Sequence, residues 1–150
     1  MKLAELLKPW YQGDVKDDEI TGILQNDSRK VRQGDIFVAY PGLVTDGRNY
    51  LEQAIAAGAI AVFYEPENWL APDHLAIAAY PIKNLARQLG AIAQRFYAVN
   101  KPPYITGVTG TNGKTTIAYQ LAQAHQLLDH KAAYIGTIGQ GTPYALEVLN

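Results

Sequence analysis

A glycine-rich run, Gly107-Val108-Thr109-Gly110-Thr111-Asn112-Gly113-Lys114-Thr115-Thr116, most constrains the fold of this 150-residue chain. It lies between a β-rich stretch at residues 104–106 and a helix-like stretch at residues 117–128. A glycine loop between a strand and a helix, closed by Lys-Thr, is typical of a nucleotide phosphate site. In such a site the loop N–H groups and the helix N-terminus point at phosphate oxygens. The run departs from the pattern G-x-x-x-x-G-K-[ST] because Val108 stands where that pattern has glycine.

The residues of the loop have distinct chemical tasks. Gly107, Gly110 and Gly113 allow the backbone to approach a bulky anion and to adopt conformations that a Cβ disfavours. Lys114 supplies a cation for the β- and γ-phosphates, and Thr115 supplies a hydroxyl of the kind that ligates Mg²⁺. The alternative is a flexible turn with a surface lysine. It is disfavoured because strand, glycines, Lys-Thr-Thr and helix all agree.

Composition excludes several classes of function. The net charge is −1, so no general attraction to nucleic acid is expected. The chain has no cysteine, which excludes disulfides and thiolate metal sites. No apolar run approaches the roughly 20 residues of a membrane helix, and the N-terminus lacks the apolar core of a signal peptide. A cytoplasmic protein that does not contact membranes is expected.

Strand-like and helix-like segments alternate along the chain, which predicts an α/β fold with some parallel pairing. The expected elements are a helix ending near Pro9, strands over 35–40, 60–64 and 75–79, and helices over 49–57 and 85–96. A polar, proline-bearing linker then predicts a boundary between a first domain, 1–98, and a second, 99–150. Beyond it we expect one β-α-β unit, with strand 104–108, helix 114–128 and strand 132–135. A phosphate-loop sheet needs more strands, so the second domain is expected to be truncated.

Two polar segments interrupt the first domain, at residues 26–35 and 41–48. The second segment follows an expected strand and precedes an expected helix, which is where open α/β sheets bind ligands. Glycine N–H groups there could hold a diphosphate, and Asp27 and Ser28 could read the edge of a planar base. Spacing alone favours ordinary turns, in which Asn, Asp, Ser and Gly also cluster, so both interpretations stay open.

These residues resemble the Mur ligases, the ATP-dependent amide-bond ligases of peptidoglycan precursor synthesis. The resemblance rests on the loop 107–116, on Asp27-Ser28-Arg29, on Gly34-Asp35-Ile36-Phe37-Val38-Ala39 and on Gly42 with Asp46-Gly47. It covers nearly the whole chain, and the displaced first glycine is normal in this family. Gly110-Thr111-Asn112-Gly113 and the later segment 135–139 look more like the ligases that add the third residue (MurE type).

The resemblance implies an activity. ATP would phosphorylate the D-glutamate γ-carboxylate of UDP-N-acetylmuramoyl-L-alanyl-D-glutamate, and an amine, from meso-diaminopimelate or L-lysine, would then displace the phosphate. ATP and Mg²⁺ are the implied cofactors, with Lys114 as catalytic residue and Thr115 at the metal. The implied ATP-binding residues are Gly110, Thr111, Asn112, Gly113, Lys114, Thr115 and Thr116.

By the same resemblance the first domain is a small α/β domain that binds the UDP end of the substrate, and the second begins a phosphate-loop α/β ATPase domain. Asn26 and Ser28 match positions that read uracil. Leu43, Val44 and Thr45 match the segment against the diphosphate, although relatives often carry His-Gln where Leu43-Val44 stands. Asn150 matches the start of a segment that contacts the sugar-peptide.

Several alternatives remain. A MurF-type ligase, which adds the terminal D-Ala-D-Ala, is the nearest one. A UDP-sugar-binding module without catalysis is another, and these 150 residues alone are expected to be inactive. An unrelated phosphate-loop motor or kinase is disfavoured by the first-domain motifs. The three histidines are interpreted as surface residues, and a monomer is expected.

Overall fold

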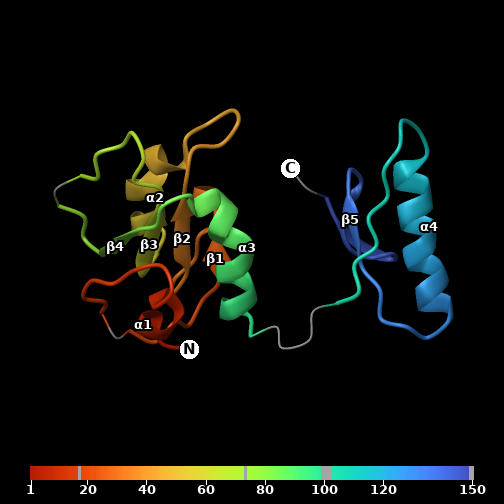
Figure 1. The fold of residues 1–150 in the computed structure, drawn as a ribbon, viewed down its shortest axis with the longest axis horizontal. Helices are drawn as coiled ribbons and strands as arrows, with labels where there is room; N and C mark the ends of the chain where they lie inside the picture. Colours follow the sequence, from red (N-terminus) through yellow and green to blue (C-terminus); the bar gives the residue numbers. More distant parts are fainter. Residues whose placement is uncertain (17, 73, 99–102, 149–150) are drawn as a thin grey trace. The chain divides into compact units, whose positions relative to one another are not determined.

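The computed structural model describes residues 1–16, 18–72, 74–98 and 103–148. The chain divides into two compact units, Met1–Lys101 (unit 1) and Pro102–Asn150 (unit 2) (Figure 1). Among the described residues, no helix is both long enough and apolar enough to cross a membrane.

Unit 1 is built on a four-stranded parallel sheet in the order β1-β2-β3-β4. The strands are β1 (Leu24–Gln25), β2 (Ile36–Ala39), β3 (Ala61–Tyr64) and β4 (Ala78–Pro81). In the centre of the sheet Ile36 pairs with Ala61 and Ala39 with Tyr64. The two central strands are almost wholly buried, as expected for parallel strands with both faces covered.

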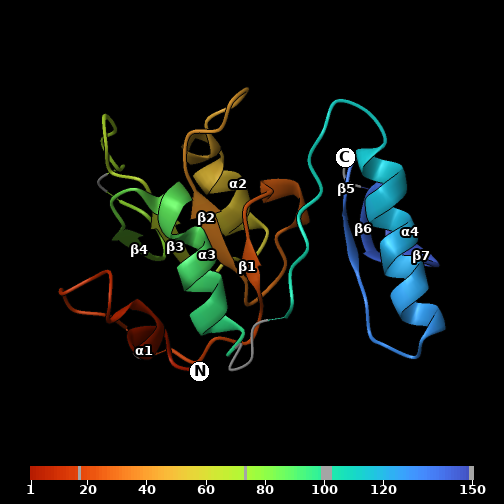
Figure 2. The same ribbon diagram turned by 45° about the vertical axis from the view of Figure 1, so that its right-hand side comes forward.

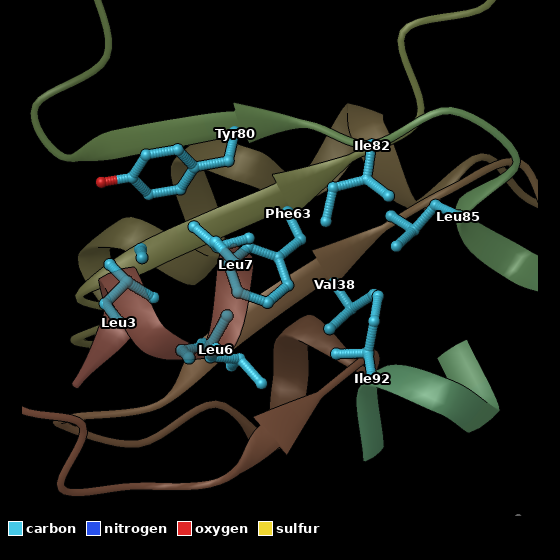
Figure 3. Close-up of a cluster of buried hydrophobic side chains, with 11 residues drawn as sticks. Leu3, Leu6, Leu7, Val38, Phe63, Tyr80, Ile82, Leu85 and Ile92 are labelled. Atoms are coloured by element: carbon cyan, nitrogen blue, oxygen red, sulfur yellow. The ribbon is translucent and has the colours of Figure 1, made fainter. Parts of the chain in front are cut away.

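Helices cover both faces of this sheet. Figure 2 shows α3 (Leu85–Phe96) in front of it and α2 (Leu51–Ala56) behind it. Successive side chains of a strand point to opposite faces, so β2 supplies Ile36 and Val38 to one core and Phe37 and Ala39 to the other. The first core also contains α1 (Leu3–Leu7) and side chains of α3; Figure 3 shows this cluster. The expected α/β architecture of the first domain is therefore present.

The Gly34-Asp35 pair fixes the start of β2. Gly34 has φ +93°, and a Cβ there would lie 2.4 Å from Oγ1 of Thr21, so only glycine fits. The buried Asp35 carboxylate accepts hydrogen bonds from the backbone N–H of Ile23, at 2.9 Å, and of Arg32, at 2.8 Å. Gly34 and Asp35 therefore have a structural role. They lie at the edge of the sheet where the strands begin, opposite the polar segments that follow β1 and β2.

Unit 2 contains one helix, α4 (Lys114–Leu127), and an antiparallel meander of three strands in the described range 103–148. The strands are β5 (Tyr134–Gly136), β6 (Gly139–Thr142) and β7 (Ala145–Glu147). The ring of Tyr119 on α4 meets the buried Tyr134 edge-on at 5.8 Å, and the Tyr119 hydroxyl donates to the Pro143 carbonyl.

Two expectations for unit 2 were wrong. Residues 104–108 form no strand, and the strand expected at 132–135 is β5, which pairs antiparallel with β6 and does not complete a β-α-β unit. A parallel strand exists only when a neighbour pairs with it. Within 103–148 the sole sheet is the meander, so the apolar side chains of Tyr104 and Ile105 remain exposed.

Candidate functional site

The carboxyl ends of parallel strands lie at one edge of the sheet, and in unit 1 this edge gathers the polar segments that follow β1 and β2. Gln25 pairs with Phe37, so residues 26–30 leave the sheet beside residues 40–48. The structure thus brings the two predicted segments to the same edge. Asn26 is exposed there, and its amide nitrogen donates to the Tyr40 hydroxyl at 3.3 Å.

Ser28 opens a single 3₁₀ turn, η1 (Ser28–Lys30), directly after this edge. Its side chain is only 8% exposed, and its Oγ donates to Oε1 of Gln53 on α2 at 2.8 Å. The hydroxyl of Ser28 is therefore held in a fixed orientation. Asp27 caps the turn by accepting from the backbone N–H of Arg29 at 3.1 Å.

The segment predicted to lie against a diphosphate forms a tight turn. Pro41 and Asp46 form a β-bridge, and the Gly42 N–H donates to the Thr45 carbonyl at 2.9 Å. Leu43 and Val44 occupy the tip with fully exposed side chains, and Thr45 is exposed as well. A ligand at this tip would meet apolar side chains and backbone N–H groups.

The polar segments after β1 and β2 each contain an Asp-x-Arg sequence whose two side chains form a bidentate ion pair, called here an Asp-x-Arg fork. The Arg29 guanidinium donates to both oxygens of Asp27, at 2.9 and 2.8 Å, and this hydrogen bonding lowers the pKa of Asp27 from 3.8 to about 2. The Arg48 guanidinium likewise donates to both oxygens of Asp46, at 2.9 and 2.7 Å, and lowers the pKa of Asp46. Both aspartates also cap a 3₁₀ turn, η1 or η2 (Gly47–Tyr50).

The two forks differ in burial. The Arg29 side chain is 73% exposed, whereas that of Arg48 is 7% exposed and lies 5.5 Å from the ring centre of Trp69. Arg48 also donates to the backbone carbonyls of Glu65, at 3.0 Å, and Glu67, at 2.8 Å. It therefore ties the turn after β2 to the segment after β3. Sequence reasoning missed this role, although the repeated Asp-x-Arg spacing was a visible signal.

In unit 2 the glycine-rich loop leads directly into α4. Gly110 and Gly113 have φ +147° and +76°, values that strain any residue with a Cβ, and Gly113 precedes the helix. Lys114 Nζ donates to the carbonyls of Gly110, at 2.5 Å, and Thr111, at 3.3 Å, so its charge lies over the loop. Thr111, Asn112 and Thr116 are exposed and Thr115 is half-buried.

This loop fits an anion. Two glycines in left-handed conformations, a cation held at the loop and the free N–H groups that begin a 14-residue helix are the features that bind phosphate. For a divalent metal the fit is limited to the Thr115 hydroxyl. In the part of the chain that the structure describes, no group of three or more His, Cys, Asp or Glu could hold a metal ion. Asn150 lies outside the described residues.

A model of the Mur ligase family, described as its catalytic domain, matches residues 20–97, which is more than half of the chain. The chain belongs to the Mur ligase family. The matched residues contain the whole parallel sheet of unit 1 and both Asp-x-Arg forks. The resemblance expected from the sequence motifs is thereby confirmed.

Individual relatives carry the names of Mur ligases. A protein of Ectopseudomonas mendocina named UDP-N-acetylmuramoyl-L-alanyl-D-glutamate--2,6-diaminopimelate ligase is 50% identical over 149 residues, covering 98% of this chain. A solved structure with the same name is 30% identical, with a TM-score of 0.70 over 97% of this chain and 29% of the other. MurF ligase from Thermotoga maritima in complex with ADP is 28% identical, with a TM-score of 0.56 over 72% of this chain and 24% of the other.

This chain spans about 29% of the length of the Ectopseudomonas relative.

Proposed function

We propose that this chain is part of an ATP-dependent amide ligase that adds diaminopimelate to UDP-N-acetylmuramoyl-L-alanyl-D-glutamate during peptidoglycan precursor synthesis. The 50% identity to a relative of that name, over nearly the whole chain, carries the proposal. Diaminopimelate is favoured over L-lysine because the curated relatives with this level of similarity are named for diaminopimelate.

The first domain, residues 1–98 in this proposal, binds the UDP end of the substrate at the carboxyl edge of its sheet. Asn26 and Ser28 contact the uracil, and the turn at residues 43–45 contacts the diphosphate. Because Leu43 and Val44 offer no polar side chain, the diphosphate is held there by backbone N–H groups and by the Thr45 hydroxyl. The full exposure of the Leu43 and Val44 side chains supports the assignment, because it leaves this turn open to a ligand.

The second domain, which begins at residue 99, binds ATP through Gly110 to Thr116. Its loop N–H groups orient the phosphates, and Lys114 moves from the loop carbonyls to the γ-phosphate, where its charge offsets the charge that develops on transfer. Thr115 is the residue that would ligate Mg²⁺, which when bound supplies further charge neutralisation at the phosphates. The MurF ligase structure from Thermotoga maritima is a complex with ADP, which supports an adenine nucleotide as a ligand of this family.

The MurF-type alternative has weaker support. Two solved structures of MurF ligases are 28% and 26% identical to this chain, with TM-scores of 0.56 and 0.64, below the 0.70 of the diaminopimelate ligase. A binding module without catalysis is the second candidate for these 150 residues taken alone, which span about 29% of the length of the Ectopseudomonas relative.

A chimaera tests the proposal. Residues 1–150 replace the matching segment of the Ectopseudomonas mendocina ligase, and phosphate release is measured with ATP, diaminopimelate and the UDP-muramoyl-dipeptide. We expect turnover that requires all three substrates and that Lys114→Ala abolishes, while the exposed Lys131→Ala retains it. A chimaera with the same melting temperature as the parent enzyme is folded, so the absence of phosphate release from it would contradict the proposal. Normal turnover in Lys114→Ala would contradict it as well.

A further inference from the structure

The hydrogen bond between Ser28 and Gln53 determines whether the Ser28 hydroxyl can offer a ligand its hydrogen or only its lone pairs. Ser28 is 8% exposed, and its Oγ donates to Oε1 of Gln53 at 2.8 Å. Gln53 is the third residue of α2 and its side chain is exposed, so it borders the same edge of the sheet. A hydroxyl has one hydrogen and two lone pairs. Once the hydrogen is given to Gln53, Ser28 presents only lone pairs to a ligand.

An acceptor at this position selects one kind of base. Uracil has an imide N–H at ring position 3, whereas cytosine has an unprotonated nitrogen there, which is an acceptor. Two acceptors that face each other leave both unpaired, and this costs binding free energy in a buried contact. Asn26 suits the same base edge, because one hydrogen of its amide is given to Tyr40 and the second can reach a base carbonyl.

We propose that Gln53 is a positioning residue that sets the donor–acceptor polarity of Ser28 and so makes the site selective for an imide N–H over an unprotonated ring nitrogen. The inference rests on the proposed role of Ser28 at the base of a uridine nucleotide. It adds a residue that acts on the base only through Ser28. The side chain at position 53 therefore determines selectivity without touching the ligand.

The test measures the dissociation constants of UDP and CDP for the 150-residue chain by titration calorimetry. The two nucleotides share the diphosphate and the ribose, so their ratio isolates recognition of the base. Gln53→Glu offers Ser28 only an acceptor and should keep or increase the preference for UDP. Gln53→Lys offers only a donor, turns the Ser28 hydrogen toward the ligand and should lower the preference by about tenfold, the effect of one mispaired buried group.

Gln53→Met frees the hydroxyl to rotate and should lower the preference by about threefold, since either orientation then becomes available. Gln, Glu, Lys and Met are all good helix formers, so α2 is expected to persist in each variant. Glu52→Gln is the matched control. It lies next to Gln53 on exposed α2 surface and changes the charge by the same amount as Gln53→Lys, and it should leave the ratio unchanged.

Failure of this inference can be distinguished from failure of the proposed function. If the unaltered chain binds no UDP, both are overturned. If it binds UDP in preference to CDP and Gln53→Lys leaves that preference intact, the role of Gln53 is wrong while the uridine site stands. In a Ser28→Ala background Gln53→Lys should no longer change the ratio; a change that persists there also overturns the inference. If thermal unfolding shows that Gln53→Lys is not folded, the Met variant decides by the same criterion.

Discussion

The two Asp-x-Arg forks have the same spacing and the same hydrogen bonds between their side chains, but one is exposed and the other is buried. This pair allows a sharp prediction about stability. Arg48→Ala should destabilise unit 1 strongly, whereas Arg29→Ala should have little effect. Exposed ion pairs contribute about 0–1 kcal/mol, because water screens the charges and the side chains lose freedom. Arg29, at 73% exposure, belongs to that class.

The magnitude for Arg48 follows from its contacts. Its side chain is 7% exposed, and its guanidinium donates hydrogen bonds to the Asp46 carboxylate and to the backbone carbonyls of Glu65 and Glu67. Removing one partner of a buried pair costs about 3–5 kcal/mol. Asp46 keeps 27% exposure and can be rehydrated, so we expect the lower end, about 3 kcal/mol. The loss of stability in Arg48→Lys should lie between the losses in Arg29→Ala and Arg48→Ala, because a single ammonium cannot reach the carboxylate and both carbonyls together.

Urea unfolding followed by tryptophan fluorescence measures this loss. The chain has two tryptophans, Trp10 and Trp69, and both lie in unit 1, so the signal reports that unit. With an m-value of about 1.5 kcal/mol/M, a loss of about 3 kcal/mol lowers the urea midpoint by about 2 M. A loss below about 1 kcal/mol for Arg48→Ala, or equal losses for the two arginines, would refute the argument from burial.

Two further predictions concern the same edge of the sheet. The folded pKa of Asp27, about 2, lies below its ordinary value, so Asp27 contributes stability above pH 3.8 that is lost as the pH falls toward 2. Because this ion pair is exposed and screened by water, the contribution stays within the small loss predicted for Arg29→Ala. Carbon-detected NMR titration should give the lowered pKa, and Arg29→Ala should raise it toward 3.8. Glu65 is buried and its carboxylate accepts from the first backbone N–H of α3 at 2.8 Å, so Glu65→Ala should cost about 1.5–3 kcal/mol in urea unfolding. The exposed Glu67→Ala is its control and should stay within about 0.5 kcal/mol; equal effects would contradict the assignment.

The sequence predicted best those elements in which apolar residues recur at a regular spacing. The helix expected at 85–96 is α3 with the same bounds, because Leu85, Leu89, Ile92 and Phe96 follow helical spacing and pack on the core. The strand expected at 75–79 lies instead at Ala78–Pro81. The last residue of β4 is Pro81, which is tolerated because β4 is an edge strand, where the missing N–H costs no ladder hydrogen bond.

Elements that depend on long-range pairing were less predictable. β1 has two residues and exists through its pairing with β2. β6 has the sequence Gly-Gln-Gly-Thr, and both of its glycines have positive φ, so neither propensity nor alternation indicated a strand. At the candidate site the sequence indicated the loops but not their side-chain partners. Gln53, for example, is 25 positions from Ser28, and only the packing of α2 against η1 brings them together.

The central claim, that the carboxyl edge of the unit 1 sheet binds a uridine diphosphate, is tested most directly by a chemical-shift titration. UDP is added to the ¹⁵N-labelled chain and the backbone amide signals are followed to saturation. We predict saturable shifts at Asn26, at Ser28 and in the turn 43–45, reduced by Ser28→Ala. An absence of saturable shifts, or shifts confined to the loop 110–116, would contradict the claim.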